Sequence, residues 1–525
     1  MDIILFYLPL VVLFALAVSD LIVGVANDAV NFTNSAIGSH VAPRWAIMLV
    51  ASIGIMIGTI YASGMLEIAR KGVMYPQYFT FDNVIIIFLA VMFSDVILLD
   101  LFNTYGLPTS TSVSFVFELL GGAVAIGIVN LSNSGADFSQ LAQYINSDRA
   151  FLMIFSIFIS ILLAFTVGAV VQFFTRLVFT FRIKKHHKIS SAIWSACAIS
   201  FIVYYILIKG LKGSMLLSSQ QSLWLHSHAA LFILIFFLAS SLVFIFLRFV
   251  LNINPLVVVV LAGTFALALA FAANDLVNFV GVPLAGLLSY QVTGFDIHAG
   301  ATLMDDLNQS TRVPVSLLLF AGIVMILTLW FSKKARHVTK TELELARHSK
   351  GKERFESSKI AKFLVDINFL LYSFAKRLLP HFVKKWIAIR YQPKKHAKHK
   401  KNLSPAFDLV RASVNLTVAS SLISLGTSLK LPLSTTYVTF MVAMGSSIAD
   451  GAWDINNAPF RVNGVLIVIG GWFLTGFAAF TAAFIFALLL HYGSTTAIFI
   501  LILISLFSVL RTRQLFRKHR DNIRT

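Results

Sequence analysis

The chain has 525 residues, of which 58% are hydrophobic and 12% charged, and its mean hydropathy is +0.84. Soluble globular proteins usually carry about 25% charged residues, so this composition excludes a soluble domain and indicates a polytopic membrane protein. The single cysteine, Cys197, excludes a disulfide framework and a cysteine metal cluster. The net charge of +19 would suggest nucleic acid in a soluble protein, but here it is concentrated in loops. We interpret it as membrane topology and expect no nucleic-acid partner.

Apolar runs long enough to cross a hydrocarbon core of about 30 Å are predicted along the whole chain. They lie at about 3–24, 45–63, 84–102, 151–180, 189–209, 228–250, 254–273, 313–331, 409–428, 463–490 and 494–511. Two shorter runs, at about 108–130 and 431–449, are rich in glycine, serine and threonine. The expected fold is all-α, with roughly 11–13 membrane segments.

Basic clusters lie at 182–188, 333–401 and 511–524. Positively charged loops usually stay in the cytoplasm, which places the carboxyl terminus there and the amino terminus outside, if the run at 108–130 makes one net crossing. The first run has neither a charged leading region nor a small-residue cleavage site, so we expect a retained helix. The predicted location is the cytoplasmic membrane, with multiple passes.

The motif Ala-Asn-Asp-x-Val-Asn-Phe occurs twice, at 26–32 and at 273–279, each time where an apolar run stops. A carboxylate between two carboxamides at membrane depth is costly unless it faces a partner, water or an ion. One copy could be the cap of a helix end. Two copies that end comparable segments favour a binding site.

A proline-led cluster of hydroxyl side chains also occurs twice, at 108–112 (Pro-Thr-Ser-Thr-Ser) and at 432–436 (Pro-Leu-Ser-Thr-Thr). Proline suits the first turn of a helix, and Ser and Thr cap such starts. Ordinary hydrogen bonding between membrane helices would explain one cluster. Duplicated clusters beside duplicated aspartate motifs favour a binding site.

The order of these features predicts two repeats. We expect a first transport repeat at 1–209, connecting helix and loops at 210–253, a second repeat at 254–331 and 406–511, a basic cytoplasmic loop at 332–405 and a basic tail at 512–525. The topology makes the repeats inverted, because 3–24 would run inward and 256–273 outward. Inverted repeats with broken helices and re-entrant Ser/Thr hairpins are typical of secondary transporters, although a channel could also use them.

The loop at 332–405 contains apolar residues at helical spacing from Ile360 to Tyr391, with basic residues between them. This pattern predicts a basic amphipathic helix on membrane lipids at the inner leaflet. A calmodulin-like or nucleic-acid partner is the sharper alternative, and a cytoplasmic regulator of this loop stays open.

The chain resembles the inorganic phosphate transporter family, the Pit type of sodium- or proton-coupled phosphate carriers. The resemblance rests on 25–31, 272–278 and the continuation 278–286. That family carries two Gly-Ala-Asn-Asp-Val-Ala-Asn motifs, one per inverted repeat, and Ser-Thr-Thr clusters on re-entrant hairpins. In this chain the motifs read Val-Ala-Asn-Asp-Ala-Val-Asn and Ala-Ala-Asn-Asp-Leu-Val-Asn. The hairpin motifs of the family often end in histidine, where this chain has Val113 and Tyr437. Many relatives also carry a membrane glutamate in the second helix, which here reads Ile-Gly-Ile-Met from Ile53. Some relatives carry sulfate.

The chemistry of the motifs predicts coupled transport. Neither motif and neither hydroxyl cluster contains Lys or Arg, and Lys430 is the nearest cation. An anion must therefore rely on backbone N–H groups at helix starts, which carry about half a positive charge, and on hydroxyls and amides. Repulsion between unit charges about 4 Å apart is about 4 kcal/mol at an effective dielectric near 20. A cation, either Na⁺ or H⁺ at Asp28 and Asp275, must enter with the anion.

We therefore expect a symporter that imports inorganic phosphate, or sulfate, by alternating access, without a cofactor and with no metal beyond a transported Na⁺. The expected coupling-ion residues are Asp28 and Asp275. The expected substrate-binding residues are Asn27, Asn31, Ser110, Thr111, Ser112, Asn274, Asn278, Ser434, Thr435 and Thr436.

Other readings stay open. Asp95, Asp100 and Glu118 lie in or near membrane runs without a repeat partner, which favours gating or interhelical pairing over substrate contact. A membrane-embedded enzyme for lipid phosphates would normally show a single acid or histidine cluster, so duplicated sites argue against an enzyme. A channel would be fast and uncoupled. The chain could form a homo-oligomer.

Overall fold

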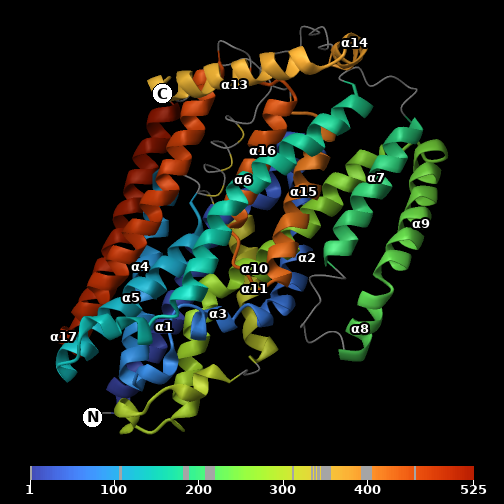
Figure 1. Cartoon of the computed structure of the whole chain (residues 1–525). Helices are drawn as coiled ribbons and strands as arrows, with labels where there is room; N and C mark the ends of the chain where they lie inside the picture. The colour runs from blue at the N-terminus through green and yellow to red at the C-terminus, as the bar shows by residue number, and fades with distance from the viewer. Residues whose placement is uncertain are drawn as a thin grey trace.

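The computed structural model describes residues 3–105, 109–180, 188–206, 219–309, 313–332, 335, 339, 343, 356–391, 405–453 and 457–524. These residues form a bundle of long helices (Figure 1). The helices of the first part are α1 (Ile3–Gly38), α2 (Arg44–Tyr61), α3 (Glu67–Lys71), α4 (Phe81–Tyr105), α5 (Thr111–Ser134), α6 (Ser147–Val178), α7 (Lys188–Val203), α8 (Ser219–Ser227) and α9 (Ala229–Phe249). The later helices are α10 (Pro255–Val292), α11 (Val315–Phe331), α13 (Lys359–Leu378), α14 (His381–Arg390), α15 (Leu409–Ser428), α16 (Thr435–Ala449) and α17 (Ala458–Arg524).

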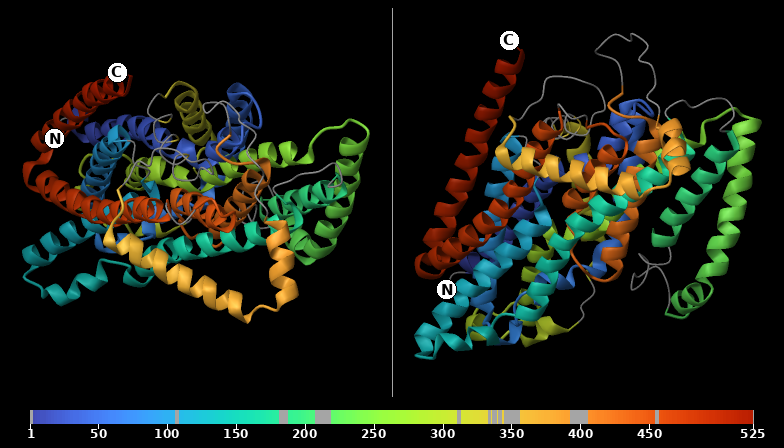
Figure 2. Two further views of the ribbon diagram at one scale, coloured as in Figure 1. Left: turned by 90° about the horizontal axis from the view of Figure 1, so that it is seen from above. Right: turned by 45° about the horizontal axis from the view of Figure 1, so that its top comes forward.

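The prediction of an all-α membrane protein is confirmed. Within the described ranges, 10 helices are long and apolar enough to span a membrane, while α11 is a shorter apolar helix. The two predicted runs at 463–490 and 494–511 both belong to α17, whose backbone leaves helical geometry at Ser494 (φ 47°, ψ −132°). The two limbs of α17 turn back on each other there and lie side by side (Figures 1 and 2).

The two aspartate motifs lie inside helices, not at helix ends as the stopping of the apolar runs suggested. α1 continues through the first motif to Gly38, and α10 continues through the second to Val292. The polar side chains of both motifs are buried against other helices, which supply hydrogen-bond partners, so the chain has no need to leave the helix. The helix breaks lie instead between α4 and α5 and between α15 and α16.

These two breaks create two helical hairpins, α4–α5 and α15–α16, whose tips reach the centre of the bundle. α10 packs against α1, α2 and α15, while α17 covers α4 and α5, and α6 covers α16. The long helices α1 and α10 thus lie together in the core, with a hairpin tip meeting each of them. Of the first proline-led cluster, Pro108 lies outside the described residues; the second, beginning at Pro432, lies within them.

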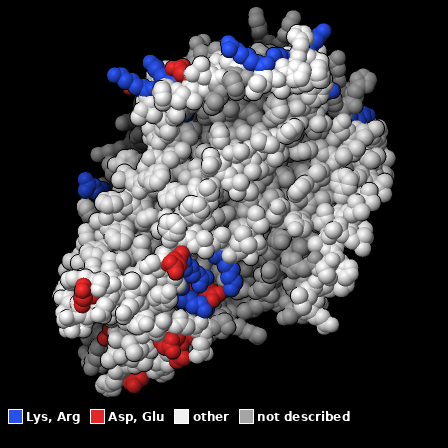
Figure 3. Space-filling view, in the orientation of Figure 1, with Lys and Arg blue, Asp and Glu red and all other residues white. Residues whose placement is uncertain are grey.

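The predicted amphipathic helix of the basic loop is present as two helices, because Leu379 and Pro380 interrupt it between α13 and α14. Both run across one end of the bundle (Figures 1 and 2), where Lys and Arg gather in the space-filling view (Figure 3). The two chain termini lie at opposite ends of the bundle (Figure 1). The basic stretches 182–187 and 392–401 lie outside the described residues.

Candidate functional site

The two hairpin tips and the two aspartate motifs meet in one polar centre inside the bundle. It contains all twelve side chains that the sequence singled out, and none of them is more than 4% exposed. Four separate elements supply them: α1, α10 and the starts of α5 and α16. A polar group this deeply buried must find partners within the protein, and the partners here cross between the two halves of the chain.

Ser110 and Ser434 are the N-caps of α5 and α16. The Oγ of Ser110 accepts a hydrogen bond from the backbone N–H of Val113 at 3.2 Å, and the Oγ of Ser434 accepts one from Tyr437 at 3.1 Å. Each cap satisfies one N–H group that a helix start leaves without a partner. Both helices therefore begin at the polar centre, where their positive dipole ends favour an anion.

Asp28 accepts hydrogen bonds from both hairpins. The hydroxyl of Thr111 donates to its Oδ2 at 3.0 Å, and the hydroxyl of Thr436 donates to its Oδ1 at 3.1 Å. The amide of Asn31, one turn further along α1, adds a longer bond at 3.4 Å. The carboxylate thus ties α1 to the tip of each hairpin.

Asp275 has the matching arrangement on α10. It accepts from the hydroxyl of Ser112 at 3.0 Å and from that of Thr435 at 2.5 Å. The amides of Asn274 and Asn278 donate to its Oδ1 at 2.8 and 3.4 Å. A carboxylate that receives only donors is well suited to the ionised form, which accepts and cannot donate.

Asn31 and Asn278, the second asparagine of each motif, determine which way the hydroxyl groups of the hairpin tips point. Asn31 donates to the hydroxyl oxygens of Thr435 and Thr436 at 3.2 and 3.0 Å, and Asn278 donates to those of Thr111 and Ser112 at 3.2 and 3.1 Å. Hydroxyls that accept from an amide are free to turn their own protons towards the aspartates. Each motif is therefore bonded to the hairpin of the opposite half as well as its own.

Asn27 and Asn274 hold the loops that lead into the hairpin tips. The Oδ1 of Asn27 accepts from the backbone N–H of Thr109 at 3.1 Å, and its amide donates to Asn103 at 2.6 Å. The amide of Asn274 donates to the carbonyl of Leu433 at 2.7 Å. These two asparagines position backbone, whereas Asn31 and Asn278 position hydroxyls.

Among the described residues, the carboxylates of the centre have no fixed positive charge beside them. Within the described ranges, no Lys or Arg forms an ion pair or hydrogen bond with Asp28 or Asp275. Lys430, the nearest cation in the sequence, has a side chain that is 57% exposed and pairs with Glu67 at 2.9 Å. It does not contribute to the buried centre.

Three contributors were not among the predicted site residues. Thr439 donates to the Oδ1 of Asn31 at 3.3 Å, Asn103 donates to the carbonyl of Val23 at 2.7 Å, and Thr109 supplies a backbone N–H. Thr439 lies one turn after Thr435, on the same face, so helical spacing could have found it. Asn103 lies near the end of α4, and only the packing of α4 against α1 brings it to the centre.

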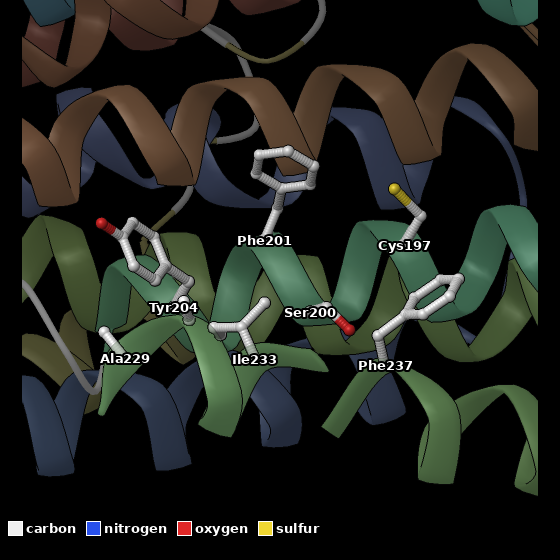
Figure 4. Close-up of a pocket in the computed structure, with 8 residues that line it drawn as sticks. Cys197, Ser200, Phe201, Tyr204, Ala229, Ile233 and Phe237 are labelled. Atoms are coloured by element: carbon white, nitrogen blue, oxygen red, sulfur yellow. The ribbon is translucent and has the colours of Figure 1, made fainter. Parts of the chain in front are cut away.

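A separate cavity of about 320 Å³ lies between α7 and α9. Its lining is aromatic and aliphatic apart from Cys197, Ser200 and the Tyr204 hydroxyl, and it contains no charged side chain (Figure 4). It shares no residue with the polar centre. Apolar lining of this kind suits lipid chains and offers nothing to a small anion.

A multi-pass helical bundle with a buried, duplicated polar centre is the architecture of a membrane transport protein. The model of the phosphate transporter family matches residues 24–341, which include both aspartate motifs and the first hairpin. The chain therefore belongs to the phosphate transporter family.

Individual relatives agree with this assignment. The chain is 28% identical over 281 residues to "Putative phosphate permease TK2061" of Thermococcus kodakarensis, an alignment that covers 51% of this chain and 64% of that protein. It is 26% identical over 292 residues to "Putative phosphate permease PYRAB14010" of Pyrococcus abyssi, with the same coverage. The match thus spans less than two thirds of the length of these relatives.

The fold has a counterpart among solved structures. The chain superposes on a structure described as "The sodium-dependent phosphate transporter" with a TM-score of 0.63, and the match covers 92% of this chain and 99% of that one. The sequence identity is 16%, so this similarity concerns the fold.

Proposed function

We propose that this chain is a secondary active symporter that imports inorganic phosphate together with Na⁺ or H⁺ by alternating access. Its two motif–hairpin units form inverted repeats, and the hairpins are re-entrant. It works as a multi-pass protein of the cell membrane, with the amino terminus outside and the carboxyl terminus in the cytoplasm. The observation that carries the proposal is the pair of buried aspartates, each bonded to hydroxyls from both hairpins.

The hydroxyls and helix starts supply the anion-binding groups. Thr111, Ser112, Thr435 and Thr436 donate to carboxylates in this conformation, and the same protons can turn to the oxygens of a tetrahedral anion. The starts of α5 and α16 add positive dipole ends. In this proposal the anion lies between the hairpin tips, where both starts contribute.

The aspartates supply the coupling. Once the hydroxyls turn to the anion, two carboxylates lie beside a charged substrate with no Lys or Arg to offset them, and a cation must enter. The Oδ1 of Asn278 is a buried acceptor with no hydrogen-bond partner among the described residues. The matching oxygen of Asn31 accepts a hydrogen bond from Thr439. The first half has Phe115 at the position that matches Thr439, and phenylalanine has no such donor. An oxygen of this kind beside Asp275 suits a hard cation such as Na⁺.

Phosphate is favoured over sulfate, the second candidate, by the carboxylates themselves. Phosphate near neutral pH carries an O–H group that can donate to Asp28 or Asp275, and sulfate carries none. A site that hydrogen-bonds a substrate hydroxyl strongly rejects an analogue without it, because its own polar groups are then left unpaired.

The test uses purified protein in proteoliposomes that contain no phosphate. Uptake of labelled phosphate and labelled sulfate is compared under an inward Na⁺ gradient, an inward pH gradient and no gradient, with protein-free vesicles as control. We expect phosphate to accumulate above its external concentration under one of the gradients and sulfate to lag behind. Equal uptake with and without a gradient would contradict symport, and preferential sulfate accumulation would contradict the substrate.

A further inference from the structure

Three carboxylates outside the polar centre are buried without partners. Asp20 on α1, Asp95 on α4 and Glu118 on α5 are 0%, 1% and 0% exposed. None of their six carboxylate oxygens has a hydrogen-bond partner among the described residues. α4 packs against both α1 and α5, so the three carboxyl groups come from adjacent helices, and electrostatic repulsion acts from Asp95 on Asp20 and from both on Glu118. We call Asp20 on α1, with Asp95 and Glu118 on the first hairpin, the acidic cluster.

The acidic cluster is adjacent to the polar centre and separate from it. Asp20 lies eight residues before Asp28 on α1, which is about 12 Å along the helix. Glu118 lies six residues after Ser112 on α5, about 9 Å away along that helix. The contrast in hydrogen bonding is complete, because Asp28 receives three donors and Asp275 four.

The described residues of the second half show no such cluster at the matching places. Aligning the two aspartate motifs pairs Asp20 with Leu267, and aligning the two hydroxyl clusters pairs Asp95 with Ala419 and Glu118 with Val442. These three apolar side chains are 1%, 1% and 0% exposed. Apolar side chains therefore fill the corresponding places. The architecture does not require carboxyl groups there, and a purely structural need does not account for three of them.

The physical state of the acidic cluster follows from its surroundings. An ionised carboxylate without a partner in an apolar interior is so costly that the group takes up a proton instead. Asp20 and Asp95 lie on the packed helices α1 and α4, and two carboxyl groups can hydrogen-bond to each other only when one of them carries a proton. Among the described residues, no group of His, Cys, Asp and Glu side chains has an arrangement that could hold a metal ion.

Charged groups on the packed helices do not offset the acidic cluster. Several helices pack against α1, α4 or α5. Two of them, α11 and α16, carry no charged residue. Asp28 acts on Asp20 and adds negative charge, and Asp275 of α10 belongs to the polar centre. The other charged side chains described on these helices are engaged or exposed elsewhere. Asp100 accepts from Thr512, Arg176 pairs with Asp408 and Asp450, Arg411 contacts Ser447, and Arg461 donates to Ala452. Arg149 lies beside Asp148 in the first turn of α6, and Arg44, Asp82, Asp148 and Arg511 are exposed.

We propose that Asp20, Asp95 and Glu118 form a proton-binding site, distinct from Asp28 and Asp275, that holds the hairpin α4–α5 against α1 when protonated. The protons come from the aqueous solution and return to it. Loss of protons leaves like charges on three adjacent helices, and their repulsion separates the hairpin from α1. This inference rests on the proposed transport function for its consequence, since protonation then becomes coupled to opening and closing of the transport path.

The first test needs no substrate. Infrared difference spectra of the purified protein between about pH 5 and about pH 8 report the C=O band of protonated carboxyl groups. We expect this band in the wild type and its reduction in Asp20→Asn, Asp95→Asn and Glu118→Gln, which keep shape and remove the titratable group. The control Asp148→Asn changes an exposed carboxyl group and should leave the band unchanged. Absence of a band assigned to these residues would overturn the proposal.

The second test measures transport in proteoliposomes with labelled inorganic phosphate. The three variants should retain phosphate exchange at equal concentrations, because neutral side chains mimic the protonated state. The ratio of internal to external phosphate that the pH gradient sustains should fall about tenfold per pH unit for each proton that is no longer coupled. If a variant fails to fold, Asp20→Leu, Asp95→Ala or Glu118→Val copies the apolar residue of the other half.

The two tests fail in different ways. If the wild type transports no phosphate, the proposed function is wrong while the infrared result still decides the proton site. Unchanged pH-driven accumulation in all three variants would overturn the proposed coupling. Reduced binding of labelled Na⁺ in the variants would assign the acidic cluster to a metal cation and would overturn the proton site.

Discussion

At the scale of single residues, the polar centre depends on neutral donors. Asp28 and Asp275 are held by hydroxyls and amides, not by Lys or Arg. Such donors can change partner by rotation about one bond, whereas a buried ion pair is strongly destabilised when one partner leaves. This arrangement suits a site that must bind and release a charged substrate in every cycle.

Neutralising either aspartate should separate binding from coupling. Asp28→Asn and Asp275→Asn keep the size of the side chain and lower the negative charge beside the anion, so equilibrium phosphate binding should survive. Coupled accumulation should be lost, because the driving cation loses a charged ligand. The measurement is gradient-driven uptake beside equilibrium binding for each variant. Wild-type accumulation in both variants would show that the aspartates are structural.

Ser110 and Ser434 have two roles that a pair of substitutions can separate. Alanine at an N-cap costs about 1 kcal/mol of stability, whereas glycine costs only a few tenths. Ser110→Gly and Ser434→Gly should therefore keep nearly wild-type thermal stability. If the hydroxyls also bind the anion, each should weaken phosphate affinity about tenfold or more, since a hydrogen bond to a charged group contributes about 1.5–3 kcal/mol. Wild-type affinity in both glycine variants would limit the serines to capping.

At the scale of secondary-structure elements, each hairpin lies against a long helix through a glycine. A Cβ at Gly121 would lie 2.3 Å from the carbonyl oxygen of Phe480 on α17, and one at Gly445 would lie 2.1 Å from that of Phe165 on α6. These glycines occupy matching places after the two hydroxyl clusters. The close approach fixes how deeply each hairpin enters the bundle.

Alanine at either glycine should push its hairpin outward. Gly121→Ala and Gly445→Ala should lower stability by about 1–3 kcal/mol, the usual cost of overpacking, and reduce uptake. Gly470→Ala is the control, because a Cβ there meets nothing within 4 Å and the helix gains up to about 1 kcal/mol. Thermal unfolding in detergent measures all three. Unchanged stability in the first two variants would contradict the close packing.

The sequence was sufficient for the membrane helices and for twelve side chains of the centre, but not for Asn103, Thr109 and Thr439. Repeated motifs identified the twelve polar side chains, since two copies of a costly polar pattern are hard to explain otherwise. The continuation of α1 and α10 through those motifs could not be predicted, because a polar stretch in an apolar run also ends a helix when no partner is near. Asp95 and Glu118 stood out in the sequence as acidic residues within membrane runs, but Asp20 did not, because only the packing of α4 against α1 brings it to their side of the bundle.

At the scale of the whole molecule, the transport machinery and the basic surface helices are separate. α13 contacts α17, while α14 contacts α6, and neither supplies a side chain to the polar centre. Just before α13, the backbone carbonyl of Glu356 accepts a hydrogen bond from the side-chain amide of Asn463 on α17 at 2.7 Å. These helices therefore stabilise the outside of the bundle.

Shortening the loop between about Thr341 and Pro405 should leave the preference between phosphate and sulfate unchanged, although yield or thermal stability can fall. Competition of each unlabelled anion against labelled phosphate uptake measures this preference. A changed order of competition after the deletion would place part of the selectivity in the loop.

In the proposed mechanism, anion and cation cross the membrane together through one centre. The most direct measurement imposes opposing gradients of phosphate and of the driving cation on proteoliposomes and finds the ratio at which net phosphate flux reverses. We expect the reversal point to move with the cation gradient in a fixed ratio, and Asp28→Asn and Asp275→Asn to abolish this movement. A reversal point set by the phosphate gradient and membrane potential alone would show an uncoupled channel and would rule out symport.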